Sequence, residues 1–192
     1  MILFTFPHWD TELFKYINDS YVNWLDPVMV VLSSSASWFV LFLIVSYFMI
    51  RKSRFWGFRE IFLITCTVAV NNIVNTLVKL VIKRPRPCGD SELQSVIRIL
   101  EDCGSQYSFF SAHSSNAFCL AICTALFFRN KYYTVLMLIW ATVVAYSRIY
   151  VGKHYPLDVI CGITFGIVMS FAGNYFLRHY REIKIKDYYT NN

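Results

Sequence analysis

Long apolar runs alternate with short charged segments along most of this sequence. An α-helix needs ~20 mainly apolar residues to cross the hydrocarbon core of a bilayer, and a chain inside lipid must satisfy its own backbone hydrogen bonds. The runs that approach or reach this length are 28–50, 60–82, 113–128, 132–145 and 156–177. The pattern predicts an all-α fold, an integral membrane helical bundle of about five transmembrane helices.

The first 26 residues have another pattern, in which acidic residues interleave with apolar ones. The apolar members recur at roughly helical spacing: Leu13, Phe14, Ile17, Tyr21 and Trp24. Such spacing predicts an amphipathic helix that lies at the membrane interface. We therefore expect three parts: an N-terminal interfacial amphipathic segment (1–26), a membrane-embedded domain (27–178) and a polar cytoplasmic tail (179–192).

The composition is that of a membrane protein. Hydrophobic residues make up 56% of the chain and the mean hydropathy is +0.44, which argues against an ordinary soluble protein. The net charge of +6 comes from basic residues that flank the apolar runs and form no single patch. This arrangement indicates membrane topology and not nucleic-acid binding. We expect contact with a lipid bilayer and no nucleic-acid partner, and the sequence leaves the oligomeric state open.

Two polar segments carry most of the side chains suited to chemistry. The first, 83–112, follows the second apolar run, and the other, 146–156, follows the fourth. Because two spans separate them, both segments lie on the same face of the membrane. Basic residues are slightly more numerous on the opposite face. The positive-inside rule therefore puts the tail in the cytoplasm and both polar segments outside.

The two segments bring charged and reactive residues to one membrane face: Lys79, Arg86, Ser111, His113, Arg148, His154 and Asp158. The lysine and the arginines form a clamp for an anion, and arginine binds phosphate through two parallel hydrogen bonds. One histidine can attack phosphorus while the other protonates the departing oxygen. The chain has no acidic cluster to hold a catalytic metal, so we expect neither a metal nor a cofactor. The pattern predicts phosphoryl transfer through a phosphohistidine, with water as the final acceptor.

The order and spacing of these residues resemble the type 2 phosphatidic acid phosphatase superfamily, the membrane lipid phosphate phosphatases. The resemblance covers roughly residues 60–177 and rests on three motifs: Lys79-x6-Arg86-Pro87, Ser111-Ala-His113 and Ser147-Arg148-x5-His154-x3-Asp158. The second motif departs from the family's Pro-Ser-Gly-His, since Phe110 and Ala112 stand in place of proline and glycine. The resemblance implies that His154 is the nucleophile, that Asp158 is its partner and that His113 is the general acid. It also implies a phosphate-binding set: Lys79, Arg86, Ser111 and Arg148.

By resemblance, the chain is a metal-independent hydrolase of phosphoric monoesters or diphosphates on membrane lipids. Its compact form resembles bacterial members, which favours a multi-pass protein of the bacterial inner membrane with the active site facing the periplasm or exterior. Undecaprenyl diphosphate is the first choice of substrate, lipid A the second, and phosphatidylglycerophosphate a further alternative. A lipid-to-lipid phosphotransferase with the same site is another alternative, and a non-enzymatic lipid-binding or transport scaffold is the least favoured.

Smaller expectations concern the polar groups around the site. Residues 93–100 of the long polar segment are expected to form a short interfacial helix. Cys88 and Cys103 can pair if that segment faces an oxidising compartment. Three further basic residues either steer an anionic headgroup or contact lipid phosphates: Lys83, Arg84 and Lys153. Three asparagines of the second apolar run are expected to hydrogen-bond to neighbouring helices: Asn71, Asn72 and Asn75.

Overall fold

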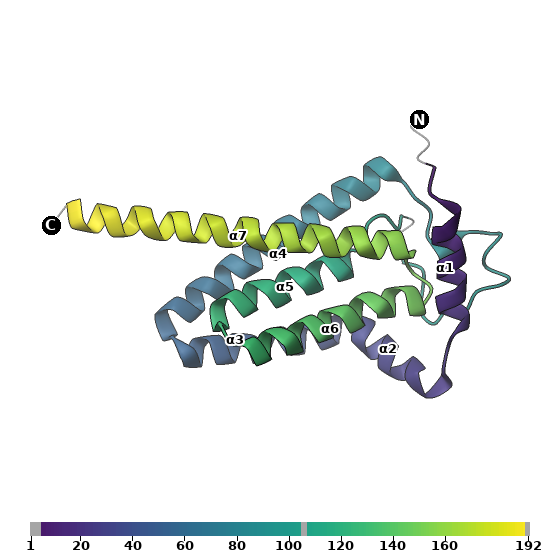
Figure 1. The fold of residues 1–192 in the computed structure, drawn as a ribbon, viewed down its shortest axis with the longest axis horizontal. Helices are drawn as coiled ribbons and strands as arrows, with labels where there is room; N and C mark the ends of the chain where they lie inside the picture. Colours follow the sequence, from purple (N-terminus) through teal and green to yellow (C-terminus); the bar gives the residue numbers. More distant parts are fainter. Residues whose placement is uncertain (1–4, 105–106, 191–192) are drawn as a thin grey trace.

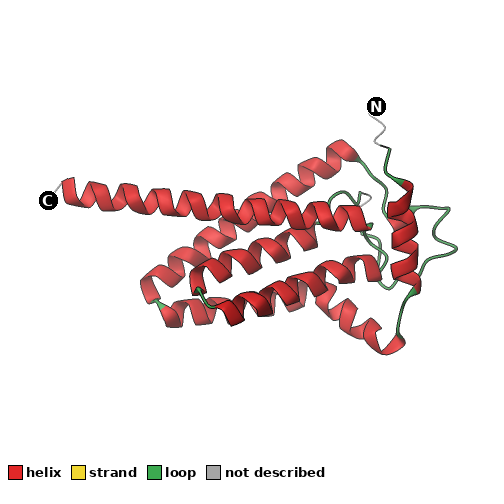
Figure 2. Cartoon of the chain, in the orientation of Figure 1, coloured by secondary structure: helices red, strands yellow, loops and turns green. Residues whose placement is uncertain are grey.

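The computed structural model describes residues 5–104 and 107–190, and most of these residues are helical (Figure 2). The α-helices, in chain order, are α1 (His8–Asp19), α2 (Asp26–Ser33), α3 (Ser35–Lys52), α4 (Arg54–Ile82), α5 (Ala112–Phe128), α6 (Lys131–Tyr150) and α7 (Pro156–Thr190). Single turns of 3-10 helix, η1 (Asn23–Leu25) and η2 (Pro87–Gly89), lie in the connections. Helices α3 to α7 form a bundle, and α1 lies across one of its ends (Figure 1). The predicted all-α class is confirmed.

Helix α5 is the centre of the bundle and packs against α4, α6 and α7. Its residues 117–121 are all buried. Lipid gives helices little hydrophobic reason to associate, so small residues that allow close backbone contact are important. Gly162 and Gly166 provide such contact on α7. A Cβ atom on Gly166 would lie 2.1 Å from the carbonyl oxygen of Ser115. The first turns of α5 therefore rest directly on the backbone of α7.

Polar side chains join α4 to α5. The side-chain amide of Asn71 donates a hydrogen bond to the hydroxyl of Ser115, and that of Asn116 donates to Asn72. Asn75, one turn further along α4, donates to the carbonyl of Phe110 at 3.0 Å. The expected interhelical hydrogen bonds are thus present for Asn71 and Asn72, whereas Asn75 bonds to the segment that precedes α5. Together these bonds hold the start of α5 and the residues just before it against the C-terminal half of α4.

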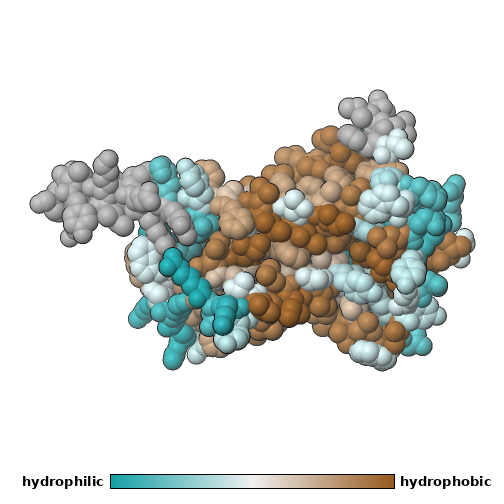
Figure 3. All heavy atoms as spheres, viewed as in Figure 1, coloured by the Kyte–Doolittle hydropathy of each residue, from teal (hydrophilic) through white to brown (hydrophobic). Residues whose placement is uncertain are grey.

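The outside of the bundle matches a lipid environment. Apolar residues cover its middle and polar residues gather at both ends, on the face that Figure 3 shows. Among the described residues, three helices are long and apolar enough to cross a membrane: α4, α6 and residues 156–176 of α7. A bent pair formed by α2 and α3 raises this number to four, while α5 has only 17 residues. The chain is an integral membrane protein, and the expected five spans are not confirmed.

The predicted first span, 28–50, is not one straight helix. Helices α2 and α3 meet at an angle of 61°, with the break at Ser34. The hydroxyl oxygen of Ser34 accepts a hydrogen bond from the amide of Ser37, whose own hydroxyl donates to the carbonyl of Ser34. Serine side chains compete in this way for backbone groups and favour helix starts. The run of serines therefore begins a new helix instead of continuing the first one.

The polar segments also differ from the prediction. Helix α6 continues to Tyr150, so Arg148 lies in its last turn and not in a loop. Residues 91–97 form turns, so the prediction of a short helix over 93–100 is wrong. The later amides of this segment bind elsewhere: that of Arg98 donates to the side chain of Asn18, and that of Leu100 to the carbonyl of Val151. These bonds replace the ones that a continuing helix would need.

The predicted N-terminal helix exists as α1, and the face that it turns to the bundle is partly polar. The side chains of Asp10, Phe14 and Asn18, spaced by one turn, are buried, whereas Leu13 and Tyr16 are exposed. Asn18 forms hydrogen bonds with the backbone of the long loop and of the end of α6. Helix α1 is therefore docked on the bundle through polar contacts as well as through Phe14.

The glycine contact between α5 and α7 gives a first prediction. We expect Gly166→Ala to lower the free energy of unfolding by about 1–3 kcal/mol, the usual cost of overpacking, because the new methyl group would overlap the Ser115 backbone. Thermal unfolding in detergent micelles measures this loss. Gly89→Ala is the control, since nothing lies within 4 Å of a Cβ atom there. Equal melting temperatures for the two variants would contradict the prediction.

Candidate active site

Three segments that are distant in the sequence meet at the end of the bundle covered by α1. They are the end of α4 with its following loop, the start of α5, and the connection from α6 to α7. The predicted site residues come together there. The charges of Lys79, Arg86 and Arg148 act on His154. Those of Lys79, Arg148 and His154 act on His113.

His154 and Asp158 are buried at the point where α7 begins. Their side chains are 1% and 0% exposed, and the Nδ1 atom of His154 lies 3.6 Å from Oδ2 of Asp158. This distance is longer than a hydrogen bond, so the two groups face each other without being bonded. The amide of Tyr155 donates to the same carboxylate oxygen at 3.1 Å. A turn at Gly152, with φ of 84°, brings the connection back so that the His154 amide donates to the carbonyl of Arg148.

Arg148 and Arg86 are the buried cations of the site. Arg148 is 2% exposed, and its Nε and Nη1 atoms form no hydrogen bond within the described part of the chain. Buried guanidinium groups normally have hydrogen-bond acceptors, so donors that lack one indicate a place for an anion. Arg86 is also buried and donates to the carbonyl of Lys153 at 3.4 Å. Lys79 lies in the last turn of α4 and is half-buried.

Ser111 and His113 lie at the start of α5. Ser111 is the N-cap of this helix: its hydroxyl oxygen accepts hydrogen bonds from the amide and the hydroxyl of Ser114. Its own amide donates to the carbonyl of Asp158 at 2.9 Å, which ties the two motifs together. The ring of His113 packs edge-on against Trp38 of α3, with 5.6 Å between ring centroids. A helix N-terminus adds backbone N–H groups that favour phosphate.

Burial and positive charge set the protonation of His154. Burial lowers its pKa well below the usual value for histidine, and the charges of Arg86, Arg148 and Lys79 lower it further. Burial also lowers the pKa of Arg86, and the charge of Asp158 opposes that effect. His154 is therefore neutral near pH 7 and keeps a lone pair for nucleophilic attack.

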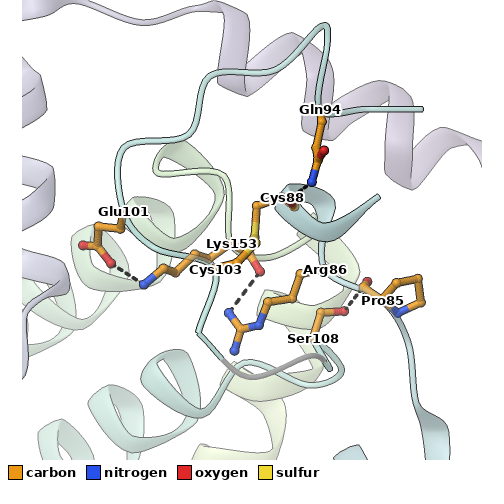
Figure 4. The surroundings of a disulfide bond; sticks show 8 residues. All are labelled: Pro85, Arg86, Cys88, Gln94, Glu101, Cys103, Ser108 and Lys153. Carbon is orange, nitrogen blue, oxygen red and sulfur yellow. Dashed lines mark hydrogen bonds and ion pairs between the residues drawn. A yellow bond between two sulfur atoms is a disulfide. The ribbon is translucent and has the colours of Figure 1, made fainter. Parts of the chain in front are cut away.

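The long loop is fixed over the site by a disulfide and an ion pair (Figure 4). Cys88 and Cys103 are bonded, as the sequence allowed, with 5.8 Å between their Cα atoms. The carboxylate of Glu101 lies 2.6 Å from Nζ of Lys153 and 3.8 Å from Nη1 of Arg148. Burial would raise the pKa of Glu101, but the hydrogen bond from Lys153 and the positive charges outweigh it, so this pKa is lowered. Lys153 is thus paired within the protein.

Arg84 is one of the three basic residues whose role the sequence left undecided. It is 4% exposed and does not face lipid. Its guanidinium group binds two carboxylates, those of Asp158 at 2.7 Å and Asp10 at 2.6 Å. Neighbouring Lys83 is exposed instead, with a left-handed backbone. The sequence did contain a signal for the contact with Asp10. This acid lies one helical turn before Phe14, so both side chains are on the same buried face of α1.

Known proteins resemble this chain over most of its length. The model of the PAP2 superfamily matches residues 60–181. A lipid A 4'-phosphatase of Bacteroides thetaiotaomicron is 24% identical over 177 residues, which are 88% of this chain and 77% of that protein. An undecaprenyl-diphosphatase of Sulfolobus acidocaldarius is 31% identical over 163 residues, 84% of this chain and 75% of that protein.

A solved structure shares the fold. It is the crystal structure of a transmembrane PAP2-type phosphatidylglycerolphosphate phosphatase from Bacillus subtilis, with a TM-score of 0.74. The two sequences are 24% identical, and the match covers 89% of this chain and 85% of the other. The likeness extends beyond the residues matched by the family model.

The electrostatics of the site give a second prediction. We expect the imidazole of His154 to be neutral at pH 6.5, where an ordinary histidine is about half protonated, because burial and three cations disfavour its charged form. Nitrogen-15 chemical shifts of ring-labelled histidine in detergent-solubilised protein report this state. The chain has 4 histidines, and loss of one signal in His154→Ala assigns the resonance. An imidazolium at pH 6.5 would contradict the prediction.

Proposed function

Because this chain belongs to the PAP2 superfamily, we propose that it removes phosphate from a membrane lipid through a phosphohistidine intermediate. The buried pair of His154 and Asp158 beside Arg148 is the observation that carries the proposal. A nucleophilic histidine must be neutral, oriented, and close to groups that hold the phosphate. His154 is buried among positive charges that favour its neutral form. The polar atoms of Arg148 that lack hydrogen bonds within the described residues supply the phosphate contacts.

The first half-reaction forms the phosphoenzyme. The phosphate is bound by the set named above: Lys79, Arg86, Ser111 and Arg148. Since Nδ1 of His154 faces Asp158, the lone pair on Nε2 attacks phosphorus and forms the P–N bond. The bond between phosphorus and the lipid oxygen breaks, and His113 donates a proton to that oxygen from its imidazolium form, which the negative charge of the bound phosphate favours. Asp158 stabilises the positive charge that develops on the imidazole, and the cations stabilise the equatorial oxygens of the transition state.

The second half-reaction releases the phosphate. A water molecule attacks the phosphohistidine and transfers its proton to His113, which lost one in the first step. The P–N bond breaks and its electron pair returns to Nε2 of His154. Inorganic phosphate leaves and the enzyme returns to its starting state. The positive charge that a metal ion would provide in other phosphatases comes from Lys79, Arg86 and Arg148, so this route needs no metal.

The substrate is a lipid with a terminal phosphate or diphosphate. The undecaprenyl-diphosphatase relative, 31% identical over 163 residues, supports undecaprenyl diphosphate as the first candidate. The lipid A 4'-phosphatase relative is aligned over slightly more residues, 177, and supports lipid A as the second candidate. The excess of basic residues on the opposite face favours an active site on the outer side of the bacterial inner membrane.

The nucleophile gives a third prediction. We expect His154→Ala to reduce phosphate release at least ~10³-fold, because no other group can form the phosphoenzyme. Rapid acid-free quenching with ³²P-labelled lipid traps an alkali-stable, acid-labile phosphohistidine in the wild type and none in the variant. His8→Ala, a change at an exposed position, is the control and keeps full activity. Chelation by EDTA leaves the wild-type rate unchanged. Full activity of His154→Ala would refute the mechanism.

Substrate choice gives a fourth prediction. In detergent micelles that contain one lipid each, we expect the highest kcat/KM for undecaprenyl diphosphate, followed by lipid A and then phosphatidylglycerophosphate. Phosphate released to solution is measured for each lipid, with a neutral acceptor lipid present in a parallel series. Label that appears in the acceptor lipid instead of in solution would identify a phosphotransferase. A clear preference for lipid A would overturn the proposed order but not the reaction class.

A further inference from the structure

Asp10, Arg84 and Asp158 form a buried chain of charges behind the proposed nucleophile. The Nη1 atom of Arg84 donates to Oδ1 of Asp158 at 2.7 Å, and Nη2 donates to Oδ2 of Asp10 at 2.6 Å. Both carboxylates are 0% exposed and Arg84 is 4% exposed. The other oxygen of Asp158, Oδ2, accepts the amide of Tyr155 and faces His154. These charged groups thus connect helix α1 to the imidazole of His154 through three successive contacts.

Arg84 is held in one orientation. Its guanidinium carbon lies 3.8 Å from the ring centroids of both Phe6 and Tyr155, and arginine stacks well on aromatic faces. The second oxygen of Asp10 accepts a hydrogen bond from the amide of Leu157 at 2.7 Å. Asp10 therefore contacts the first turn of α7 directly, one residue before Asp158.

We propose that Asp10 and Arg84 are positioning residues for His154, which makes α1 a part of the catalytic apparatus. The inference rests on the proposed function and adds residues to it. Asp10 lies outside residues 60–181, to which the family model extends. Arg84 lies within them, but it does not belong to the three motifs that identify the family resemblance.

The geometry explains what Arg84 does. An aspartate that orients an imidazole must stay ionised and must present one oxygen to the ring. Arg84 binds the other oxygen of Asp158, and the amide of Tyr155 fixes the oxygen that faces His154. The carboxylate then has no freedom to rotate. A lysine in this place would keep the charge but lack the planar fork that binds two carboxylates at once.

Charge balance explains what Asp10 does. Arg84 and Asp158 alone would form a neutral pair, and His154 would feel little net negative charge from it. With Asp10 added, the three groups Asp10, Arg84 and Asp158 together carry one net negative charge, and buried charges act strongly on their neighbours. This charge favours the positive imidazole that develops when Nε2 bonds to phosphorus. Buried ion pairs add little net stability, so their presence beside the nucleophile is better explained by catalysis.

The pH dependence separates this role from a structural one. The charged or titratable groups that act on His154 come from every element around it: Lys79 of α4, Arg86 and Lys153 of the loops, His113 of α5, Arg148 of α6 and Asp158 of α7. Loss of the negative charge of Asp10 makes this environment more positive. The pKa of His154 then falls, and the acidic limb of the pH profile of kcat/KM moves to lower pH.

Asp10→Asn and Glu12→Gln are the matched variants that test the proposal. Both turn a carboxylate of α1 into an amide, but Glu12 is exposed. Asp10→Asn keeps an oxygen for the Leu157 amide but loses the charge and the acceptor for Arg84, because its NH2 group then faces the guanidinium. We expect kcat of Asp10→Asn to fall about 10- to 100-fold, as for other losses behind an oriented histidine, with KM within about twofold of the wild type. The acidic limb of its kcat/KM profile moves to lower pH. Asp10→Glu returns this limb to the wild-type position, and Glu12→Gln has the kcat and the pH profile of the wild type.

The outcomes are distinguishable. An Asp10→Asn protein that is folded and has the kcat and pH profile of Glu12→Gln overturns the proposal. If Asp10→Asn does not fold in micelles, Arg84→Lys decides. A lowered kcat at unchanged KM then supports the proposal, and a wild-type kcat overturns it. A wild-type protein without activity on any lipid phosphate would instead refute the proposed function, independently of the variants.

Discussion

The contact between the first turns of α5 and α7 is the constraint on which the site depends. The amide of Ser111 donates to the carbonyl of Asp158, and a Cβ atom on Gly162 would lie only 2.5 Å from the Ser111 carbonyl oxygen. A larger residue would hold the two backbones apart. Because glycine allows the contact, His113 and Ser111 reach the region of His154 although they are far apart in the sequence. The close packing of α5 against α7 therefore also determines the geometry of the site.

Burial imposes a second constraint, since a charge without a partner in such a place is costly. Arg148 and Asp158 are at most 2% exposed. Arg84 provides the partner of Asp158, and α1 in turn provides Asp10 for Arg84. The long loop contributes Glu101, which pairs with Lys153. Helix α1 and the disulfide-linked loop thus do more than cover the end of the bundle, because they supply the charges that make the buried site possible.

The sequence predicts those features that depend on local pattern or on counting. Apolar runs predicted the helices, and the even number of runs between the polar segments put them at one end. The spacing of His154 and Asp158 predicted that they face each other at a helix start. The break at Ser34 was missed because apolar content hides a local competition for hydrogen bonds. The partners of Arg84 were missed because each lies 74 residues away, and no local pattern encodes a contact of that range.

The sum of charges around His154 gives the charge that a phosphate group would meet under the proposed function. The cations named in the site are Lys79, Arg84, Arg86, Arg148 and Lys153, and the carboxylates are Asp10, Glu101 and Asp158. With His154 neutral, these groups leave an excess of two positive charges. A phosphate monoester carries about −1.5 to −2 at neutral pH, so its binding neutralises the cluster. Two of the three carboxylates come from α1 and the long loop. These two elements therefore reduce the positive charge that a lipid phosphate would meet under the proposed function, while the three motifs supply the proposed reacting and binding groups.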